Sequence, residues 1–188
     1  MGDLLQNETC GILTEKVPKG KRIVVKKGEP KLPPTGWRKY IWRAPIYLYR
    51  VGLGFLLGKR FLLLNHIGRK TGLPRQAVVE IARYDPEANV YYIASGFGKK
   101  SDWYRNLRAH PDVTIQVGNK KMHVHARMLS PKESAEEMAR YVLAHPRAAM
   151  ELAKIIGLEL ENPDDEDEWR TVGREYIPFV ALEVIGEE

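Results

Sequence analysis

The chain has 188 residues, of which 44% are hydrophobic and 29% are charged, and its formal net charge at neutral pH is +6. This size fits one domain with an appendage, and the composition excludes a disordered, fibrous or membrane-spanning chain. Cys10 is the single cysteine, so no internal disulfide can form, and together with a polar start this predicts a cytoplasmic protein.

The basic residues are concentrated in the first half of the chain. Residues 1–83 contain 17 Lys and Arg against 5 Asp and Glu, whereas residues 84–188 contain 13 against 19. Such an excess of positive charge indicates an anionic partner for the first half, and the candidates are membrane lipid, nucleic acid or a phosphorylated cofactor.

Two segments precede the first predicted strand. Residues 1–36 are rich in Lys, Pro and Gly, which predicts a flexible basic extension. Residues 37–58 mix aromatic and basic side chains around apolar ones, and Pro45 predicts one bent helix or two short helices. This mixture is also typical of a helix that lies on a membrane surface, so peripheral contact with the inner face of a membrane is one expectation for 37–58. The other expectation for 37–58 is a helix that closes one end of the fold.

From residue 59 onward the pattern changes to short alternating runs that end in turn residues. Six strands are predicted, over residues 61–65, 76–83, 90–95, 113–117, 121–129 and 176–185. Helices are predicted over 103–109, with Asp102 as the cap, over 131–144, where Ser130 and Glu133 form a capping box, and over 146–156. The acidic run "ENPDDEDE" predicts a solvated loop.

Six short strands joined mainly by hairpins predict an α+β fold over residues 59–188. Its centre is a split β-barrel of about six mainly antiparallel strands with flanking helices. A doubly wound sheet would need strands that alternate regularly with helices, and the Gly-x-Gly of "GLGFLLG" has no strand before it, so it is not a dinucleotide-binding fingerprint.

The turn between the first two predicted strands, "GRKTGLPR", carries more positive charge than a turn requires. Arg69 and Arg75 provide guanidinium groups, Lys70 an ammonium group and Thr71 a hydroxyl, while Gly72 suits the bend itself. These donors suit phosphate or carboxylate oxygens, although a solvated hairpin turn would have the same composition. The spacing of a Walker loop is absent.

A second candidate stretch, "IASGFGKKSDWYRNL", follows the third predicted strand. Its glycines would let the backbone approach a ligand without side-chain bulk, and the helix after them places one apolar and one amide side chain at helical spacing. Core packing and turn formation would also explain these residues. The residues singled out are Ser95, Gly96, Phe97, Gly98, Trp103 and Asn106.

The two stretches together resemble a known family. With "GRKTGLPR", "YYIASGFG", "DWYRNLRAHPDVTIQVG" and "REYIPFVALEV" in this order, the chain resembles the deazaflavin-dependent nitroreductases, whose split β-barrel is related to that of FMN-binding oxidoreductases. The resemblance implies coenzyme F420, a deazaflavin whose tail carries a phosphodiester and several glutamates. The cofactor-binding residues that it implies are Arg69, Lys70, Thr71, Gly72, Arg75, Ser95, Gly96, Phe97, Gly98, Trp103 and Asn106.

The activity implied by this resemblance is hydride transfer between reduced F420 and a small electron-poor acceptor such as a quinone or a nitro compound. Because the cofactor supplies the chemistry, no catalytic acid or base is named. FMN is the alternative cofactor, since its single phosphate would suit the same basic turn. A homodimer is expected, as barrels of this kind often are dimeric.

Other kinds of partner for such a chain are nucleic acid, a metal ion and a membrane. Nucleic acid is not expected, because the cations form no stripe with stacking aromatics and no nucleic-acid module is present. No metal site is expected, because His123 and His125 share a strand face without a third ligand at suitable spacing. A peripheral membrane or ligand-binding protein without catalysis is the alternative function, and His66 and His110 stand near the proposed site, where they could sense ligand charge.

Overall fold

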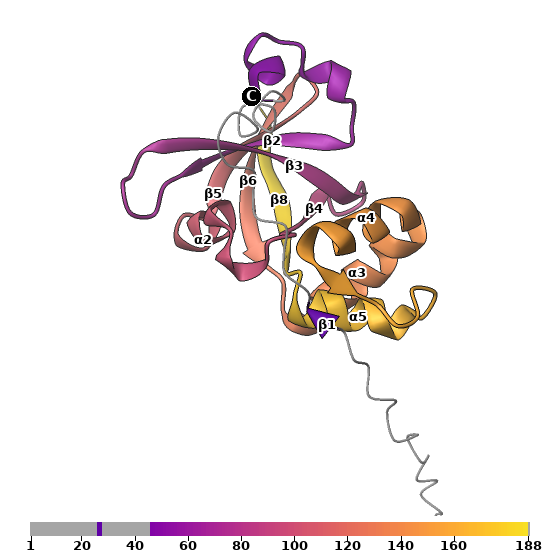
Figure 1. Ribbon diagram of the computed structural model, residues 1–188. Helices are drawn as coiled ribbons and strands as arrows, with labels where there is room; N and C mark the ends of the chain where they lie inside the picture. The colour runs from indigo at the N-terminus through magenta and orange to yellow at the C-terminus, as the bar shows by residue number, and fades with distance from the viewer. Residues whose placement is uncertain (1–25, 28–45, 188) are drawn as a thin grey trace, which may run out of the picture.

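The computed structural model describes residues 26–27 and 46–187, and its main feature is a closed barrel of six strands (Figure 1). Neighbouring strands are antiparallel throughout, in the ring order β2-β3-β4-β8-β6-β5, and β5 closes the barrel against β2. The strands are β2 (Phe61–Ile67), β3 (Pro74–Asp85), β4 (Val90–Ala94), β5 (Asp112–Val117), β6 (Lys120–Met128) and β8 (Phe179–Glu187). The predicted fold class is therefore confirmed.

The alternation of side chains along the strands explains why the barrel closes. On β2, Leu62 and Leu64 are fully buried and face Ile93, Ile115 and other apolar side chains of the opposite strands. A period of two residues therefore directs one face of each strand into the barrel and leaves the other for the surface or for covering helices. Helix α2 (Asp102–Ala109) adds Tyr104 and Leu107 to the same core.

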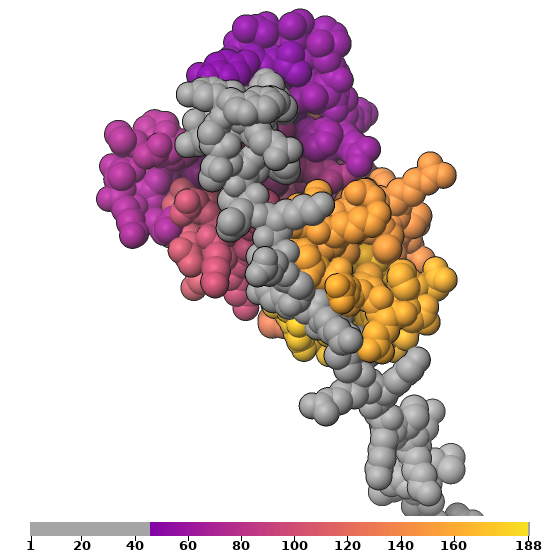
Figure 2. Space-filling view, viewed as in Figure 1, coloured from indigo at the N-terminus to yellow at the C-terminus, as the bar shows by residue number. Residues whose placement is uncertain are grey.

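Three further helices form a separate layer beside the barrel. They are α3 (Pro131–Ala144), α4 (Pro146–Ile156) and α5 (Glu166–Glu175), and they appear as the orange lobe in Figure 2. This layer packs around Trp169 and Met138, and Phe179 at the start of β8 joins it to the barrel. Helix α3 begins with the predicted capping box, in which Ser130 and Glu133 exchange hydrogen bonds, and α4 has its predicted bounds.

The prediction of a solvated loop over the acidic run is confirmed for residues 161–165 and wrong for residues 166–168. The run contains the start of α5, whose N-terminal Asp165 side chain accepts a hydrogen bond from the backbone N–H of Asp167 at 2.9 Å. Three acids, Glu166, Asp167 and Glu168, occupy the first helical turn, where the helix dipole and free N–H groups favour negative charge. The charge that indicated a loop thus stabilises a helix start.

The prediction for the cap of α2 is wrong by one residue. Ser101 is the N-cap, without a side-chain capping bond, and Asp102 is the first residue of the helix. The carboxylate of Asp102 instead pairs with Arg69 at 3.0 Å.

The N-terminal segments lie largely outside the described residues. Of the predicted extension 1–36, the structure describes β1 (Lys26–Lys27), which pairs with β7 (Leu158–Glu159). Of the predicted helical segment 37–58, residues 46–50 are helical and Gly54–Leu57 form a 3-10 helix. The hydroxyl of Tyr49 donates to the carbonyl of Phe61 at 2.8 Å and so ties this segment to β2. None of the described helices is long and apolar enough to span a bilayer.

The packing of α5 on α3 depends on a glycine. A Cβ placed on Gly173 would lie 2.4 Å from the carbonyl oxygen of Ser134 and 2.6 Å from Cβ of Met138. Both neighbours belong to α3, and a helix backbone cannot move aside without losing its own contacts. The glycine therefore sets how closely the two helices approach.

We expect Gly173→Ala to lower the free energy of unfolding by about 1 to 3 kcal/mol, because overpacking at a helix contact forces the backbones apart. Urea unfolding followed by circular dichroism measures the change. Gly186→Ala is the matched control, since a Cβ on Gly186 meets no atom within 4 Å. Equal stabilities of the two variants would contradict the packing argument.

Candidate functional site

The basic turn between β2 and β3 stands beside a cavity of about 560 Å³. The hairpin closes through the N–H of Gly68, which donates to Leu73 at 2.9 Å, and Gly72 has a φ of +65° that favours glycine. The predicted site residues that line this cavity are Arg69, Lys70, Thr71, Arg75, Trp103 and Asn106. The fold thus brings the turn and helix α2 together, although about thirty residues separate them in the sequence.

Asn106 fixes the position of the turn. Its buried Oδ1 accepts hydrogen bonds from the backbone N–H of Arg69 at 3.1 Å and from Nη1 of Arg69 at 2.9 Å. The same guanidinium pairs with Asp102 at 3.0 Å. Arg69 is therefore bound to α2 through both backbone and side chain, and it serves to anchor the turn as well as to present charge.

The other face of the Asn106 amide sets the protonation of His66. Since Oδ1 of Asn106 accepts from Arg69, its Nδ2 donates, and Nδ2 lies 3.0 Å from Nδ1 of His66. An acceptor at Nδ1 means that the imidazole is neutral with its proton on Nε2. Burial and, next, the positive charge of Arg75 lower the pKa of His66 below 6.5, while the Ile67 backbone and Asp102 act weakly in the opposite direction.

Lys70 and Arg75 complete the positive rim of the cavity. The structure records no hydrogen bond or ion pair of either side chain with another described residue. Most backbone N–H groups of the turn already donate within the protein, so these two side chains are the donors that the rim offers to anionic oxygens. This donor set fits the phosphodiester and carboxylates of a deazaflavin tail, and it would also fit a single phosphate.

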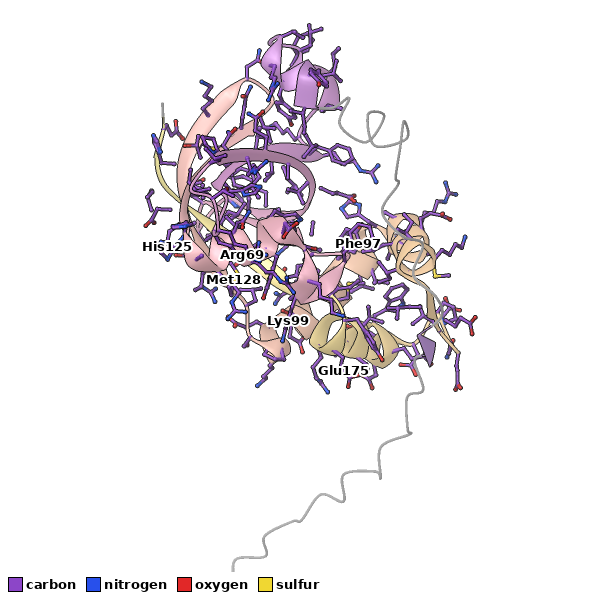
Figure 3. All side chains as sticks on the ribbon, turned by 60° about the vertical axis from the view of Figure 1, so that its left-hand side comes forward. Arg69, Phe97, Lys99, His125, Met128 and Glu175 are labelled. Carbon is purple, nitrogen blue, oxygen red and sulfur yellow. The ribbon has the colours of Figure 1, made fainter. Side chains whose placement is uncertain are left out.

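The glycine loop after β4 faces a different cavity. Ser95 is fully buried, and its Oγ donates to the carbonyl of Gly98 at 2.8 Å, which holds the loop in shape. Gly96, Phe97 and Gly98 line a cavity of about 350 Å³ together with Tyr176 and other residues of the helical layer. Figure 3 shows Phe97, Lys99 and Glu175 on this side of the molecule. The structure therefore does not bring the glycines to the cavity of the basic turn.

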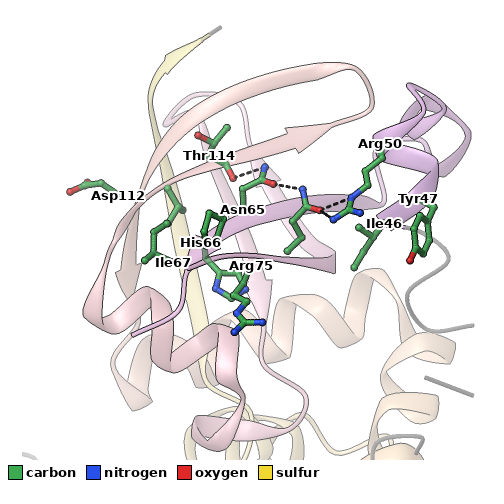
Figure 4. A pocket seen from close by; sticks show the side chains of 12 residues that line it. Ile46, Tyr47, Arg50, Asn65, His66, Ile67, Arg75, Asp112 and Thr114 are labelled. Atoms are coloured by element: carbon green, nitrogen blue, oxygen red, sulfur yellow. Dashed lines mark hydrogen bonds between the residues drawn. The ribbon is translucent and has the colours of Figure 1, made fainter. Parts of the chain in front are cut away.

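A third cavity, of about 690 Å³, was not indicated by any sequence motif. It lies between the helical residues 46–50 and strands β2, β3 and β5 (Figure 4). Its wall carries a row of polar side chains, Asn65, Gln76 and Thr114, that strand register places side by side. Because these residues come from three strands, only the alternation along each strand could have indicated that they share a face.

No metal site is found among the described residues, which contain no group of three His, Cys, Asp or Glu side chains that could hold an ion. His125 instead bonds to Asp112 at 2.7 Å through Nδ1. His110, which the sequence placed near the site, is exposed and lines none of these three cavities.

The sequence matches known proteins over its central part. A family model described as F420H(2)-dependent quinone reductase matches residues 46–154, which is more than half of the chain. A protein of Mycobacterium tuberculosis (strain ATCC 25618 / H37Rv), provisionally named an F420H(2)-dependent quinone reductase, is 36% identical over 98 residues, which are 51% of this chain and 81% of that protein.

A second protein of the same organism, named F420H(2)-dependent quinone reductase, is 40% identical over 73 residues, which are 38% of this chain and 48% of that protein. The chain thus matches about half of that relative's length. Among solved structures, a protein of unknown function from Agrobacterium tumefaciens str. C58 has a TM-score of 0.50 at 15% identity, over 85% of this chain and 60% of that chain. At this identity the likeness concerns the fold alone.

We expect His66 to make stability depend on pH. Its folded-state pKa is lower than the unfolded value near 6.5, so its contribution is present above pH 6.5 and is lost as the pH falls toward the folded-state pKa. Urea unfolding between pH 7.5 and 5 should show this loss in the wild type and a smaller loss in His66→Gln.

Asn106→Asp supplies the opposite case. The new carboxylate would accept a hydrogen bond from a protonated Nδ1 of His66 and would favour the charged imidazolium. The pKa of His66 should therefore rise in this variant. Titration of the His66 ring by NMR measures the pKa directly in both proteins. A wild-type value above 6.5 would contradict the hydrogen-bond assignment.

Proposed function

The chain belongs to the F420H(2)-dependent quinone reductase family, and from this membership we propose that it is an F420-dependent oxidoreductase that reduces a quinone-like acceptor. The membership bears out the resemblance to deazaflavin-dependent reductases, and it implies coenzyme F420 as the cofactor. A nitro compound is a second acceptor class that the same chemistry would serve.

The observation that carries the proposal is the positive rim around the cavity of about 560 Å³, defined by Lys70, Arg75 and the anchored Arg69. Cations this close repel one another unless an anion offsets their charge, and only Arg69 has a carboxylate partner among the described residues. A tail with a phosphodiester and carboxylates would supply several anionic oxygens at once.

When bound, reduced F420 would supply a hydride to an electron-poor acceptor. The residues of this chain would bind, orient and exclude water around that exchange. Lys70 and Arg75 would hold the tail, the Thr71 hydroxyl would add a hydrogen bond, and Trp103 would cover part of the cavity. Asn106 would act on the cofactor indirectly, by keeping Arg69 in place. For the glycine loop we propose contact with a part of the cofactor that extends beyond this cavity.

A second candidate role is contact with an anionic membrane surface. Val51 and Leu56 are 66% and 62% exposed, and Tyr47 and Phe55 are exposed beside them, although they are large apolar residues. Figure 2 shows this segment, in indigo and purple, at the end of the molecule away from the helical layer. Exposed apolar side chains among basic ones are typical of interfacial binding, which would bring the protein to the inner face of a membrane, where lipid-soluble quinones reside.

We also propose a homodimer in the cytoplasm, as expected from the sequence. Analytical ultracentrifugation of the full chain tests the assembly, and a mass near 21.5 kDa at all concentrations would contradict it.

We expect Lys70→Ala and Arg75→Ala each to weaken binding of F420 by about 1 to 3 kcal/mol, because each removes a charge-assisted hydrogen bond to the tail. Tryptophan fluorescence during cofactor titration measures the affinity. Lys132→Ala is the control, since Lys132 is exposed at the start of α3 and lines neither cavity near the turn.

The same titration with FMN tests the alternative cofactor. Tighter binding of FMN than of F420 would overturn the proposed cofactor. Unchanged F420 affinity in both variants would overturn the assignment of the tail to this rim.

We expect the double variant Phe55→Ser/Leu56→Ser to lose sedimentation with phosphatidylglycerol vesicles, because it removes two exposed apolar contacts. Leu143→Ser is the matched control, as Leu143 is 74% exposed on α3 in the helical layer. Equal sedimentation of all three proteins would exclude this segment as the membrane contact.

A further inference from the structure

The cavity of about 690 Å³ outside the barrel shares only Arg75 with the residues assigned to the cofactor. It nevertheless adjoins the proposed cofactor site, because His66, Arg75 and Gln76 line both cavities. The β2–β3 hairpin is thus a wall shared by two spaces, one with the basic turn and one facing the helical residues 46–50 (Figure 4). A ligand in the outer cavity would lie next to the cofactor.

A directed chain of hydrogen bonds crosses the wall of the outer cavity. Nε and Nη2 of Arg50 donate to Oε1 of Gln76 at 3.0 and 2.8 Å, and Nε2 of Gln76 donates to Oδ1 of Asn65 at 2.8 Å. Nδ2 of Asn65 then lies 3.4 Å from the carbonyl oxygen of Thr114. We call these three side chains, Arg50, Gln76 and Asn65, the amide relay.

The direction of the amide relay follows from chemistry. A guanidinium has no acceptor, so the group of Gln76 that faces Arg50 must be the oxygen. The nitrogen of Gln76 must then face Asn65, and the oxygen of Asn65 must face Gln76. Both amide oxygens therefore accept hydrogen bonds within the relay. The N–H groups that the relay does not use remain available to a ligand.

The net charge of the cavity also favours a ligand with acceptor oxygens. Arg50 and Arg75 are cationic, and Asp112 is the one acid among the described residues that line the cavity. Oδ1 of Asp112 already bonds to His125 at 2.7 Å, and Figure 4 shows this carboxylate turned away from the amide relay. The wall thus offers donors and positive charge to a ligand, which must bring acceptor oxygens.

The remaining lining is apolar and partly flat. Ile46, Ile67, Pro74 and Val113 provide aliphatic surface, and the ring of Tyr47 stands 5.7 Å from the guanidinium carbon of Arg50. A flat, mostly apolar ligand with carbonyl oxygens at its edge fits this combination. A ligand with several charges fits the basic turn better, because the outer cavity has fewer unpaired cations and more aliphatic surface.

We propose that the outer cavity is the acceptor site, in which a quinone lies between the aliphatic wall and Tyr47 with one carbonyl oxygen facing Arg50 and Gln76. This inference rests on the proposed function. Arg50 and Gln76 are then the residues that select acceptors with a carbonyl oxygen at the ring edge.

The donors also suit the charge that forms during reduction. A quinone that gains a hydride receives two electrons and one hydrogen from the reduced F420 of the proposed function, and one of its oxygens becomes negative. A proton from water then neutralises that oxygen. Fixed N–H groups and a guanidinium stabilise a forming oxyanion more than the neutral carbonyl, so Arg50 would assist the reaction as well as binding.

The experiment measures acceptor kinetics and cofactor affinity in the same variants of the full chain. With 2-methyl-1,4-naphthoquinone as the probe and reduced F420 in excess, Arg50→Ala and Gln76→Leu should each lower kcat/KM by about tenfold or more. The Kd of F420 should stay within about twofold in Arg50→Ala, since Arg50 lines only the outer cavity. Gln76 also lines the cofactor cavity, so Gln76→Leu is judged on quinone kinetics and quinone binding. Calorimetry of the same quinone with cofactor-free protein should show weaker binding by both variants.

Arg127→Ala is the matched control, because Arg127 also makes two side-chain hydrogen bonds, to Glu183 and Glu133, but lines neither cavity. It should leave kcat/KM and quinone binding unchanged. Thermal unfolding of each variant establishes that it folds, and two different substitutions keep the test valid if one of them does not.

Three results would overturn the inference. Unchanged quinone kinetics in both variants would show that the acceptor binds elsewhere. A raised Kd of F420 in Arg50→Ala would show that the outer cavity holds the cofactor instead, which leaves the proposed function intact. Failure of the wild type to bind F420 at all would overturn the proposed function itself, and this inference with it.

Discussion

The amide of Asn106 is the contact on which the arrangement of the site depends. It comes from α2, yet it bonds to the backbone and side chain of Arg69 in the hairpin turn and to the imidazole of His66 on β2. Leaving a buried amide without its hydrogen-bond partners would cost free energy. The hairpin turn, α2 and β2 are therefore held in a single relative position. That position sets where Lys70 and Arg75 stand, because both belong to the hairpin that Asn106 anchors.

Charge is distributed unevenly around this anchor. Arg69, the most enclosed of the three cations on the turn, has the carboxylate of Asp102 beside it, with a side chain that is 23% exposed. Lys70 and Arg75 have no such partner among the described residues, and they stand at the mouth of the cavity. Partial compensation therefore keeps the folded turn stable while leaving positive charge for a ligand. The pKa of His66 is lowered first by burial and then by Arg75, so the neutral imidazole adds no further cation to the site.

The sequence predicted what local patterns encode. Alternation marked all six strands of the barrel, and the capping box at Ser130 marked the start of α3. Helix α5 was missed because its first turn is acidic, a composition shared by solvated loops and helix N-termini. The strands around the basic turn were predicted too short, since Pro74 and Asp85 are turn residues by type but extend β3 in the structure.

The candidate site was predicted only in part, for a physical reason. Arg69 and Asn106 were identified as separate motifs, but their contact depends on how α2 packs against β2, which no local pattern contains. Gly96 faces the helical layer, where a Cβ on it would approach Leu152 to 2.9 Å, so its role depends on the position of α4. The outer cavity was missed because its polar wall consists of single residues from several elements, each of which resembles an ordinary exposed residue.

The amide relay shows how two fixed groups can set the polarity of a surface built by others. Gln76 and Asn65 each have a donor and an acceptor, so by themselves they favour neither kind of ligand. Arg50 stands outside the barrel and can only donate, so its contact with Gln76 turns the amide oxygen of Gln76 toward the guanidinium. At the other end, the carbonyl oxygen of Thr114 can only accept, so it favours the same direction by taking Nδ2 of Asn65 at 3.4 Å. The donor character of this wall therefore depends both on a segment outside the barrel and on the backbone of β5.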